Sequence, residues 1–305
     1  MPLYNKGQYI KDALDSILMQ ETTYKYQILI SDNASTDDGL KIAKEYQDKY
    51  ADLIVILESK QNVGFPKNIT KLYTSIKTPY FALVCPDDYW ISNTKIQDAL
   101  DFLESHKDYT SYQDKTIIEY PDRKQIYVDY PIDHTCDFQS FSKGRGATMG
   151  HASNSFFRTS LLKNHINNIK NPKNEAFEKV FSGDSFMNFI ALYEGKAYHG
   201  TKIGSVFRHH GEGEWSSLGQ VGQNFDNTFL WRYMWEYFNG EYMIFLLVSC
   251  QLYISHKDKL IEYLHSIQDD KILRAKVNEF KELESLYNIN MQKLVEFQNS
   301  LQANA

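Results

Sequence analysis

The sequence has few cysteines, and they follow no pattern. Cys85, Cys136 and Cys250 are its only cysteines, and none belongs to a Cys-x-x-Cys pair. An odd, widely spaced set excludes a disulfide framework and a zinc knuckle of the usual spacing. Disulfides are rare in the cytosol, so the composition favours a reducing, cytoplasmic setting.

A long apolar run is also missing. The most apolar stretch covers 242–248 and extends loosely to 254. It is shorter than the roughly 20 residues that a membrane-spanning helix needs. The N-terminus has neither the basic stretch nor the apolar run of a signal peptide. We therefore interpret 242–254 as part of a buried core helix.

Positive charge is in deficit. The chain has 33 Lys and Arg against 39 Asp and Glu, a formal net charge of −6. A general nucleic-acid-binding protein carries a basic field, so we expect no nucleic-acid partner. A nucleotide ligand stays compatible, because a metal ion and a few local groups can hold a diphosphate. The 42% hydrophobic and 24% charged residues indicate a globular protein with a core.

Apolar residues alternate between two periods over the first hundred residues. Helical spacing and short apolar strands follow one another at 10–18, 26–30, 40–46, 53–57, 69–76, 80–84 and 96–103. This alternation predicts an α/β fold, with a mostly parallel, Rossmann-like sheet flanked by helices. Ligands of such sheets bind beyond the carboxyl ends of the strands.

The rest of the chain is less regular. Residues 106–150 are polar and rich in tyrosine, and we predict short strands and a mobile loop there. A strand leading into a helix is expected at 151–158, a helix at 184–194, and a strand ending near Phe207. From about 220 onward the pattern is helical.

Polar residues follow the first two of these strands. Residues 31–37 read Ser-Asp-Asn-Ala-Ser-Thr-Asp, which suits either a polar ligand or a helix N-cap. Residues 62–68 read Asn-Val-Gly-Phe-Pro-Lys-Asn, where the glycine allows a positive φ. Taken alone, the second stretch indicates only a turn and a helix start.

The third strand is followed by a pair of carboxylates. Residues 85–90 read Cys-Pro-Asp-Asp-Tyr-Trp. Adjacent carboxylates repel each other, and a divalent cation relieves that repulsion. Hard oxygen ligands suit Mg²⁺ or Mn²⁺. The alternative is a solvated Asp-Asp turn.

The order of these motifs resembles the family 2 glycosyltransferases, which have the GT-A fold. Residues 2–5, Pro-Leu-Tyr-Asn, resemble the opening Pro-x-Tyr-Asn of that family, and 32–37 resemble its Asp-Asp-Gly-Ser-Thr-Asp. Residues 62–68 match its Asn-x-Gly-x-x-x-Asn, and 87–90 match its metal-binding Asp-x-Asp region. The resemblance covers about 2–217.

The resemblance implies an inverting transferase that moves a sugar from a nucleotide-sugar, a UDP-sugar first of all, to a saccharide or carrier-linked glycan. It implies a place in polysaccharide biosynthesis and a GT-A catalytic domain at 1–217, followed by a helical region at 218–305. The donor-binding residues it implies are Pro2, Tyr4, Asn5, Asp32, Asn33, Asn62, Gly64, Asn68, Asp87 and Arg208.

Particular roles also come from the resemblance. Asp32 would contact the base of the nucleotide. Mn²⁺ or Mg²⁺ would be held by Asp87, Asp88 and, from the Arg-His-His stretch at 208–210, His210. Asp184 would deprotonate the acceptor hydroxyl, although a helix N-cap explains an aspartate there as well. A role for His151 on the acceptor side is the weakest of these hypotheses.

The sequence departs from the family in two places. Cys85 stands where the family has an acidic residue, and a thiol is a poor Mg²⁺ ligand. Met1 directly precedes Pro2, where family members carry an apolar strand of about five residues. We therefore expect the first strand to be missing or truncated, and the natural coding sequence to begin further upstream or this chain to be cut from a longer one.

The C-terminal region offers surfaces without an assigned partner. Its aromatic residues at 225–238 are expected to pack onto the first domain rather than to stack on sugars. Leu273 and Leu294 belong to a seven-residue repeat, with Val277 and Met291 at the alternate seam. Such heptads predict a homodimer through 268–301. Docking on a partner enzyme or peripherally on the inner membrane face is the alternative.

Two other functions stay open. A sugar nucleotidyltransferase would need a glycine-rich basic loop after its first strand, and 5–9 has none. A binding or scaffold protein with a GT-A fold but no turnover is compatible with Cys85 and the short first strand. Retention of Asp32, Asp87, Asp88 and Asp184 speaks against it.

Overall fold

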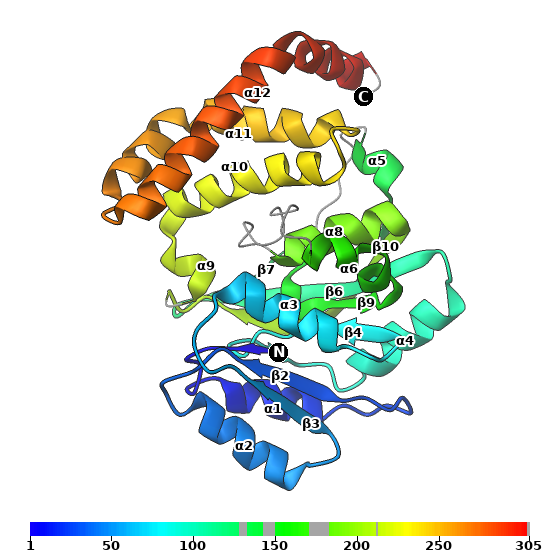
Figure 1. Ribbon diagram of the computed structural model, residues 1–305. Coiled ribbons are helices and arrows are strands. Elements are labelled where there is room, and N and C mark those ends of the chain that lie inside the picture. Colours follow the sequence, from blue (N-terminus) through cyan, green and yellow to red (C-terminus); the bar gives the residue numbers. More distant parts are fainter. Residues whose placement is uncertain (128–132, 143–149, 171–182, 212, 304–305) are drawn as a thin grey trace. The chain divides into compact units, whose positions relative to one another are not determined.

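The computed structural model describes residues 1–127, 133–142, 150–170, 183–211 and 213–303 (Figure 1). The chain forms two compact units. Unit 1 comprises Met1–Phe138, Ala147–Lys173 and Gly183–His210, and unit 2 comprises Gln139–Gly146, Asn174–Ser182 and Gly211–Ala305. Within 106–150, where a mobile loop is predicted, residues 128–132 and 143–149 lie outside the described residues.

Unit 1 begins with a parallel sheet of strand order β1-β2-β3. Its strands are β1 Pro2–Leu3, β2 Ile28–Asp32 and β3 Ile54–Glu58. Its helices are α1 Ile10–Leu18, α2 Gly39–Lys49 and α3 Phe65–Ser75. Helix α3 packs on β1 and β2, and α2 packs on β3. The parallel, helix-flanked sheet expected for the fold is confirmed.

Short apolar stretches hold this sheet together. Leu3, Leu14, Ile30 and Ile54 are fully buried and share one core. Strand β1 has only two residues, yet the Ser31 N–H donates to the Met1 carbonyl and extends the ladder, 2.9 Å. Strand β1 thus pairs parallel with β2 over its two residues, and the predicted truncation of the first strand stays a prediction.

A second, mixed sheet has the order β4-β9-β6-β10-β5, with β7 beside β6 and β8 beside β10. Its strands are β4 Tyr80–Ala82, β5 Tyr89–Trp90, β6 Tyr109–Glu119, β7 Lys124–Ile126, β8 His134–Cys136, β9 Ser155–Arg158 and β10 Lys196–Arg208. Strands β6 and β10 run parallel, whereas the other pairs are antiparallel.

Strand β4 differs from the prediction that 80–84 continues the first sheet. It pairs antiparallel with β9, opposite Phe156, Phe157 and Arg158. The Phe81 and Phe157 rings stack across this pair with centroids 5.3 Å apart. Cross-strand aromatic pairs of this kind stabilise a sheet. Strand β4 therefore belongs to the second sheet, as the partner of β9, and not to the first.

Strand β6 was not visible in the sequence as a single long strand. Its 11 residues are mostly polar, yet Ser111, Gln113, Asp114 and Thr116 are buried. The strand lies between β9 and β10, and hydrogen bonds to neighbouring elements satisfy several of these side chains. Because β6 is mostly polar, its sequence did not indicate a long strand in the middle of the sheet.

Helices complete unit 1. They are α4 Lys95–Ser105, the 3₁₀ helix η1 Ala152–Asn154, α6 Ser160–Lys170 and α8 Gly183–Glu194. The short helix α5 Phe138–Ser142 lies where the two units meet along the chain. Helix α4 packs on β6, and α8 packs on β6 and β10. The strand-then-helix at 151–158 and the helix at 184–194 correspond to the predicted elements.

Unit 2 is helical. Its helices are α9 Glu214–Ser217, α10 Gly219–Tyr237, α11 Met243–Ser266 and α12 Asp270–Ala303. Helix α11 packs on both α10 and α12. Inside unit 2, the rings of Trp231 and Phe141 stack with centroids 6.0 Å apart, and the Ser249 hydroxyl donates to the Thr228 carbonyl.

The heptad repeat lies on α12, but one of its two seams was misplaced. Leu283 and Leu294 are buried, whereas Met291 is 44% exposed. The Phe280 ring contacts Tyr253 of α11, so part of the stripe is used within unit 2. The predicted dimer through 268–301 and the peripheral membrane contact stay predictions.

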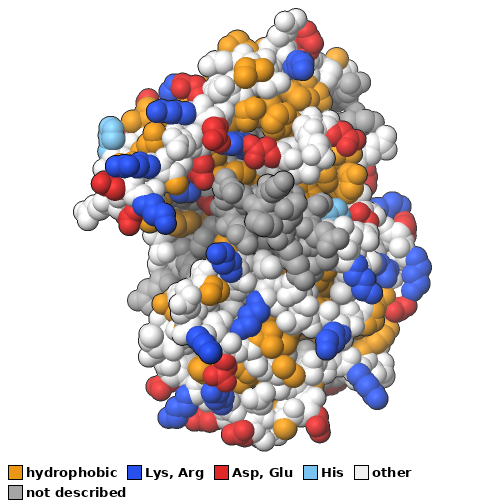
Figure 2. Space-filling model, viewed as in Figure 1, with side chains coloured by type: hydrophobic (Ala, Val, Ile, Leu, Met, Phe, Trp, Pro, Cys, Tyr) orange, Lys and Arg blue, Asp and Glu red, His pale blue; other side chains and the backbone are white. Residues whose placement is uncertain are grey.

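Two surface findings complete the description. Within the described residues, every helix is too short or too polar to cross a membrane. On the face shown in Figure 2, basic and acidic side chains are interspersed.

Candidate active site

Amide side chains join the loops that follow β2 and β3. Asn33 Nδ2 donates to Asn62 Oδ1 at 2.9 Å, and Asn33 Oδ1 accepts from the Val63 N–H at 2.9 Å. Asn62 Oδ1 also accepts from the Gly64 N–H at 2.8 Å. Gly64 has φ 85°, which suits glycine, and α3 begins directly after it with a proline in its first turn.

A second contact fixes α3 to the end of β2. Asn68 Nδ2 donates to the Ser31 carbonyl at 2.9 Å, and the Ser31 hydroxyl donates to Asn68 Oδ1 at 2.6 Å. Asn68 is 2% exposed. Asn33, Asn62 and Gly64 are therefore joined by hydrogen bonds to one another, whereas the amide of Asn68 is satisfied by Ser31 at the end of β2.

Asp32 shapes the turn after β2. Its carboxylate accepts from the Ala34 N–H at 3.1 Å and from the Ser35 N–H. Asn5, which follows β1, accepts from the Thr36 N–H at 2.8 Å. Both Asn5 and Ala34 have positive φ, 50° and 62°. Helix α2 begins only after Asp38, which makes no side-chain cap, so Asp32 is not its N-cap.

Asp87, which follows β4, lies beside the Lys6 and His210 side chains. Its Oδ2 is 2.9 Å from Lys6 Nζ and 3.3 Å from His210 Nε2. Burial alone would raise the pKa of Asp87, but the hydrogen bond with His210 and the charge of Lys6 outweigh it and lower that pKa to about 2. Asp87 is thus held as a carboxylate.

Asp88 has the opposite environment. It is 1% exposed, and burial together with the charge of Asp87 raises its pKa well above the usual value. The Ser153 hydroxyl donates to its Oδ2, and the Arg208 N–H donates to its Oδ1 at 3.2 Å. Both of its oxygens are therefore oriented by the protein.

A divalent cation fits this pair of carboxylates. Ligand atoms of Cys85, Asp87 and Asp88 lie within 4.8 Å of one another. Burial raises the pKa of the Cys85 thiol well above its usual value, so the site offers a neutral thiol beside two carboxyl groups. Carboxylate oxygens suit Mg²⁺ or Mn²⁺, and the His210 imidazole lies 3.3 Å from Asp87 Oδ2.

Arg208 brings a partly unpaired cation to the same place. Its guanidinium lies 4.4 Å from the centre of the Tyr89 ring, and its Nη2 donates to Asp12 at 2.5 Å. Its Nη1 is buried with no hydrogen-bond partner within the described residues. A buried N–H without a partner is uncommon in proteins.

The model of the family "Glycosyl transferase family 2" matches residues 1–166. The chain belongs to glycosyl transferase family 2. Among curated relatives, the dTDP-rhamnosyl transferase RfbG of Shigella flexneri is 31% identical over 150 residues, which is 48% of this chain and 50% of that protein. The chain spans about a third of the length of several other curated relatives it matches.

Solved structures confirm the GT-A fold of this family 2 member. S. aureus TarS 1-349 in complex with UDP-GlcNAc has a TM-score of 0.54 at 15% identity, covering 95% of this chain and 90% of that one. The Pyrobaculum calidifontis mannosyltransferase PcManGT, in complex with GDP-Man and Mn2+, has a TM-score of 0.56 at 15% identity, covering 99% and 83%.

Asp184 lies in the first turn of α8 of this family 2 domain. Burial raises its pKa, although its own N–H and that of Ser185 donate to the carboxylate. Its charge also contributes to raising the pKa of Cys85 and Tyr73. The carboxylate therefore accepts hydrogen bonds from backbone N–H groups at the start of α8.

Sequence reasoning missed three contributors to the site. Lys6 pairs with Asp87, Ser153 orients Asp88, and the Tyr9 ring stacks on His210 at 4.7 Å. Lys6 carried a signal, because it directly follows the Pro-Leu-Tyr-Asn motif. Pro2 and Tyr4 flank the same loop, with Pro2 paired to Ser31 in the sheet.

A groove of about 560 Å³ opens beside Arg208. Its walls are the turn between β6 and β7 and the end of β10. The ring centroids of His209 and Tyr120 lie 4.8 Å apart. The Arg123 guanidinium lies 4.1 Å from the centre of the Tyr120 ring. The lining residues are Glu119, Tyr120, Pro121, Asp122, Arg123, Lys124, Arg208, His209 and His210.

Proposed function

We propose that this chain transfers a sugar from a nucleoside-diphosphate sugar, first of all a UDP-sugar, to a hydroxyl of a saccharide or carrier-linked glycan. The reaction inverts the anomeric carbon and is assisted by Mn²⁺ or Mg²⁺. One observation carries the proposal. Lys6 and His210 both contact Asp87, and the Arg208 N–H donates to the adjacent Asp88, in the loop that follows β4 of the family 2 domain.

The nucleoside would bind to the loops after β1, β2 and β3. Asn33 and Asn62 already satisfy each other, so the base would meet a preformed surface and little ordering entropy would be lost. Asp32 is the residue we assign to the base, with Asn5 and Tyr4 beside it. Gly64 gives the ligand close access to the backbone.

The diphosphate would lie over Asp87. A bound Mn²⁺ or Mg²⁺ supplies charge neutralisation for the leaving diphosphate. Asp87, Asp88 and His210 would hold that ion. Lys6 and Arg208 would donate to phosphate oxygens.

Asp184 would act as the general base. The acceptor oxygen forms its bond to the anomeric carbon as the bond from that carbon to the diphosphate oxygen breaks. The acceptor proton passes to Asp184, and the diphosphate leaves with the bonding electron pair. A pKa raised by burial strengthens the carboxylate as a base once it is ionised. Direct displacement of this kind inverts the centre.

The acceptor would approach along the groove beside Arg208. The Tyr120 and His209 rings offer flat surfaces on which a sugar ring can pack, and Arg123 and Lys124 offer hydrogen-bond donors. A place in the assembly of surface polysaccharide rests on analogy with a relative that is named a minor teichoic acid biosynthesis protein.

The test is a thermal-shift and hydrolysis screen of UDP-, GDP- and TDP-sugars, each with and without Mn²⁺. All three nucleotides are needed, because the named relatives and neighbours differ in the donor that they use or hold. We expect one donor to raise the melting temperature only with metal and to be hydrolysed slowly.

Matched variants decide the outcome of that screen. Asp87→Asn should abolish the shift, whereas Glu58→Gln, an exposed carboxylate at the end of β3, should leave it unchanged. Binding of a donor without hydrolysis or transfer to any acceptor would support the scaffold alternative. Absence of binding under every metal condition would overturn the proposal.

A further inference from the structure

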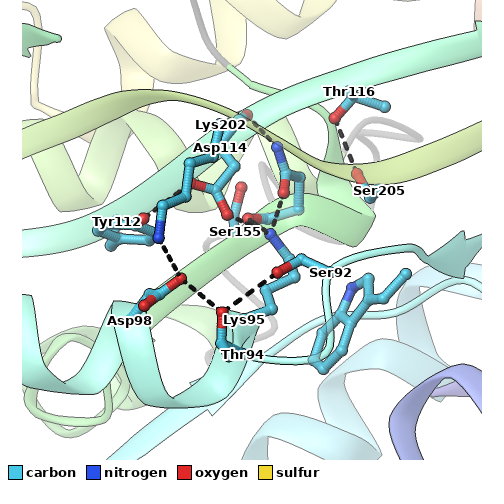
Figure 3. Close-up of polar contacts among 12 residues, drawn as sticks. Ser92, Thr94, Lys95, Asp98, Tyr112, Asp114, Thr116, Ser155, Lys202 and Ser205 are labelled. Atoms are coloured by element: carbon cyan, nitrogen blue, oxygen red, sulfur yellow. Dashed lines mark hydrogen bonds and ion pairs between the residues drawn. The ribbon is translucent and has the colours of Figure 1, made fainter. Parts of the chain in front are cut away.

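Lys95 is a buried lysine that the proposed reaction does not use. It stands at the start of α4, and its side chain is 0% exposed. Figure 3 shows it pointing from α4 toward Asp114 on β6. Burying an ammonium group is costly unless it is paired and hydrogen-bonded, so the contacts of Lys95 define what it does.

Two residues receive the ammonium group. Lys95 Nζ lies 3.1 Å from Asp114 Oδ2 and donates to the side-chain oxygen of Asn154. Asp114 Oδ1 accepts from the Tyr112 hydroxyl at 2.7 Å. Asn154 Nδ2 in turn donates to the Asp114 carbonyl, which closes a ring of contacts among Lys95, Asp114 and Asn154.

The space around this ring of contacts is filled by neighbouring groups. A Cβ added at Gly204 on β10 would stand 2.7 Å from both Lys95 Nζ and Asp114 Oδ2. The Lys95 ammonium also lies 5.8 Å from the Trp90 ring and 5.6 Å from the Phe156 ring. The position of Asn154 is therefore set by groups that cannot shift freely.

Asn154 belongs to a turn that contacts residues 85–90, the stretch that contains Asp87 and Asp88 and is called the acidic loop below. It ends the 3₁₀ helix η1, and Ser153 is the residue before it. The Ser153 hydroxyl donates to Asp88 and accepts from the Cys85 N–H at 3.0 Å, and its carbonyl accepts from the Trp90 indole N–H at 2.7 Å. One residue thus contacts the acidic loop at three points.

We propose that Lys95, Asp114 and Asn154 are positioning residues for the metal site. The buried ion pair anchors η1, and Ser153 in that turn aims the Asp88 carboxyl group at the cation. This inference rests on the proposed metal-assisted function. A buried ion pair serving the fold alone would stabilise unit 1 without any effect on metal affinity.

The test is a calorimetric titration with Mn²⁺ alone, without donor or turnover, alongside thermal melting of each variant. The double variant Lys95→Met/Asp114→Asn removes both buried charges together, which avoids leaving one of them unpaired. Ser153→Ala cuts the link to Asp88, and Gly204→Ala crowds the ring without changing any charge. Supporting groups of metal ligands typically change affinity by about 10- to 100-fold.

We expect each of these variants to weaken Mn²⁺ binding by about 10-fold or more. The matched control is Lys202→Met, which breaks the exposed Lys202–Asp98 pair beside the same ring, 2.8 Å, and should bind Mn²⁺ like the wild type. If the double variant does not fold, the Ser153 and Gly204 variants decide the question.

Two results would overturn the inference, and they are distinguishable. Variants that melt at lower temperature but bind Mn²⁺ as tightly as the wild type would show that the ring serves the fold only, and the proposed function would stand. A wild-type chain that binds no Mn²⁺ would remove the metal from the proposed function and the inference with it.

Discussion

The loops after β2 and β3 differ from the loop after β4 in the partners of their polar side chains. In the first pair, neutral amides such as Asn33, Asn62 and Asn68 hydrogen-bond to one another and to backbone. In the second, Asp87 and Asp88 meet Lys6, His210 and the backbone of Arg208. The first set is neutral and hydrogen-bonded within the protein, whereas the second set contains charged side chains.

The contrast separates what each set contributes. A neutral hydrogen bond adds about 1 kcal/mol of net stability, and a buried partner left unpaired costs about 1–3 kcal/mol. Charged groups in a partly buried site interact more strongly with a ligand that carries charge. Substitutions in the amide loops should therefore lower stability, and substitutions around Asp87 should lower binding and turnover.

Asp87→Asn should have the largest effect. The variant keeps the shape of the side chain and removes the charge that holds the cation, so we expect kcat/KM to fall about 1000-fold or more. Donor hydrolysis measured against Mn²⁺ concentration tests this. Asp48→Asn, at an exposed position of α2, is the control. A fall of only a few-fold would place the cation elsewhere.

Asp184→Asn should come next. Asparagine caps a helix as well as aspartate does, so α8 should keep its start, whereas the loss of a general base costs about 100- to 10,000-fold in rate. We expect donor binding in the thermal-shift assay to be unchanged. Wild-type turnover in this variant would reduce Asp184 to its capping role.

Stability should also depend on pH through His199, which lies outside both loop sets, on β10 opposite His134. Burial, helped by the charge of His134, lowers its pKa from 6.5 to about 4. The unfolded chain then binds the proton more readily, so stability is complete above about pH 6.5 and falls toward pH 4.

The full loss is about 3 kcal/mol. Urea denaturation at a series of pH values measures it, and His199→Gln should flatten that stretch of the profile. An unchanged slope in the variant would assign the pH dependence to another group.

Asn68→Ala should lower the free energy of unfolding by about 2 kcal/mol, because the Ser31 hydroxyl and carbonyl are both left without their buried partner. Denaturant unfolding measures this loss, and catalysis at saturating donor should change little. The paired variant Ser31→Ala/Asn68→Ala should recover part of the stability. A variant as stable as the wild type but unable to bind donor would show that the amide loops contribute to donor binding and not to stability.

The smallest effect is expected at Lys44. Its exposed ion pair with Glu58 at 2.9 Å should contribute less than about 1 kcal/mol, so Lys44→Ala should melt close to the wild type. Thermal melting at low and high salt measures it. A larger loss would mean that surface charge near β3 supports the amide loops.

How much was predictable depended on the range of the interaction. The helix and strand alternation up to Leu103 follows from local periodicity, and the polar motifs at the strand ends located Asp32 and Asp87. The contacts of Lys6 with Asp87 and of Ser153 with Asp88 join residues far apart in the chain, so no local pattern announces them.

Two errors have a physical origin. The buried polar residues of β6 made a central strand look like a surface segment, because the groups that satisfy them, such as Asn188 for Gln113, lie on other elements. In α12, the apolar side chain of Met291 suggested a seam position, but the buried stripe passes through Leu283 instead. Apolar character alone does not reveal which way a helix face turns.

The backbone at Ala34 stores strain in the turn that Asp32 and Asn5 hold. Its φ of 62° is left-handed, a conformation that costs an alanine about 1 kcal/mol and a glycine almost nothing. The family motif described above has glycine at this position. Ala34 therefore marks a place where this chain accepts lower stability, and Ala34→Gly is a single change that should relax the turn without altering any of its hydrogen-bonding groups.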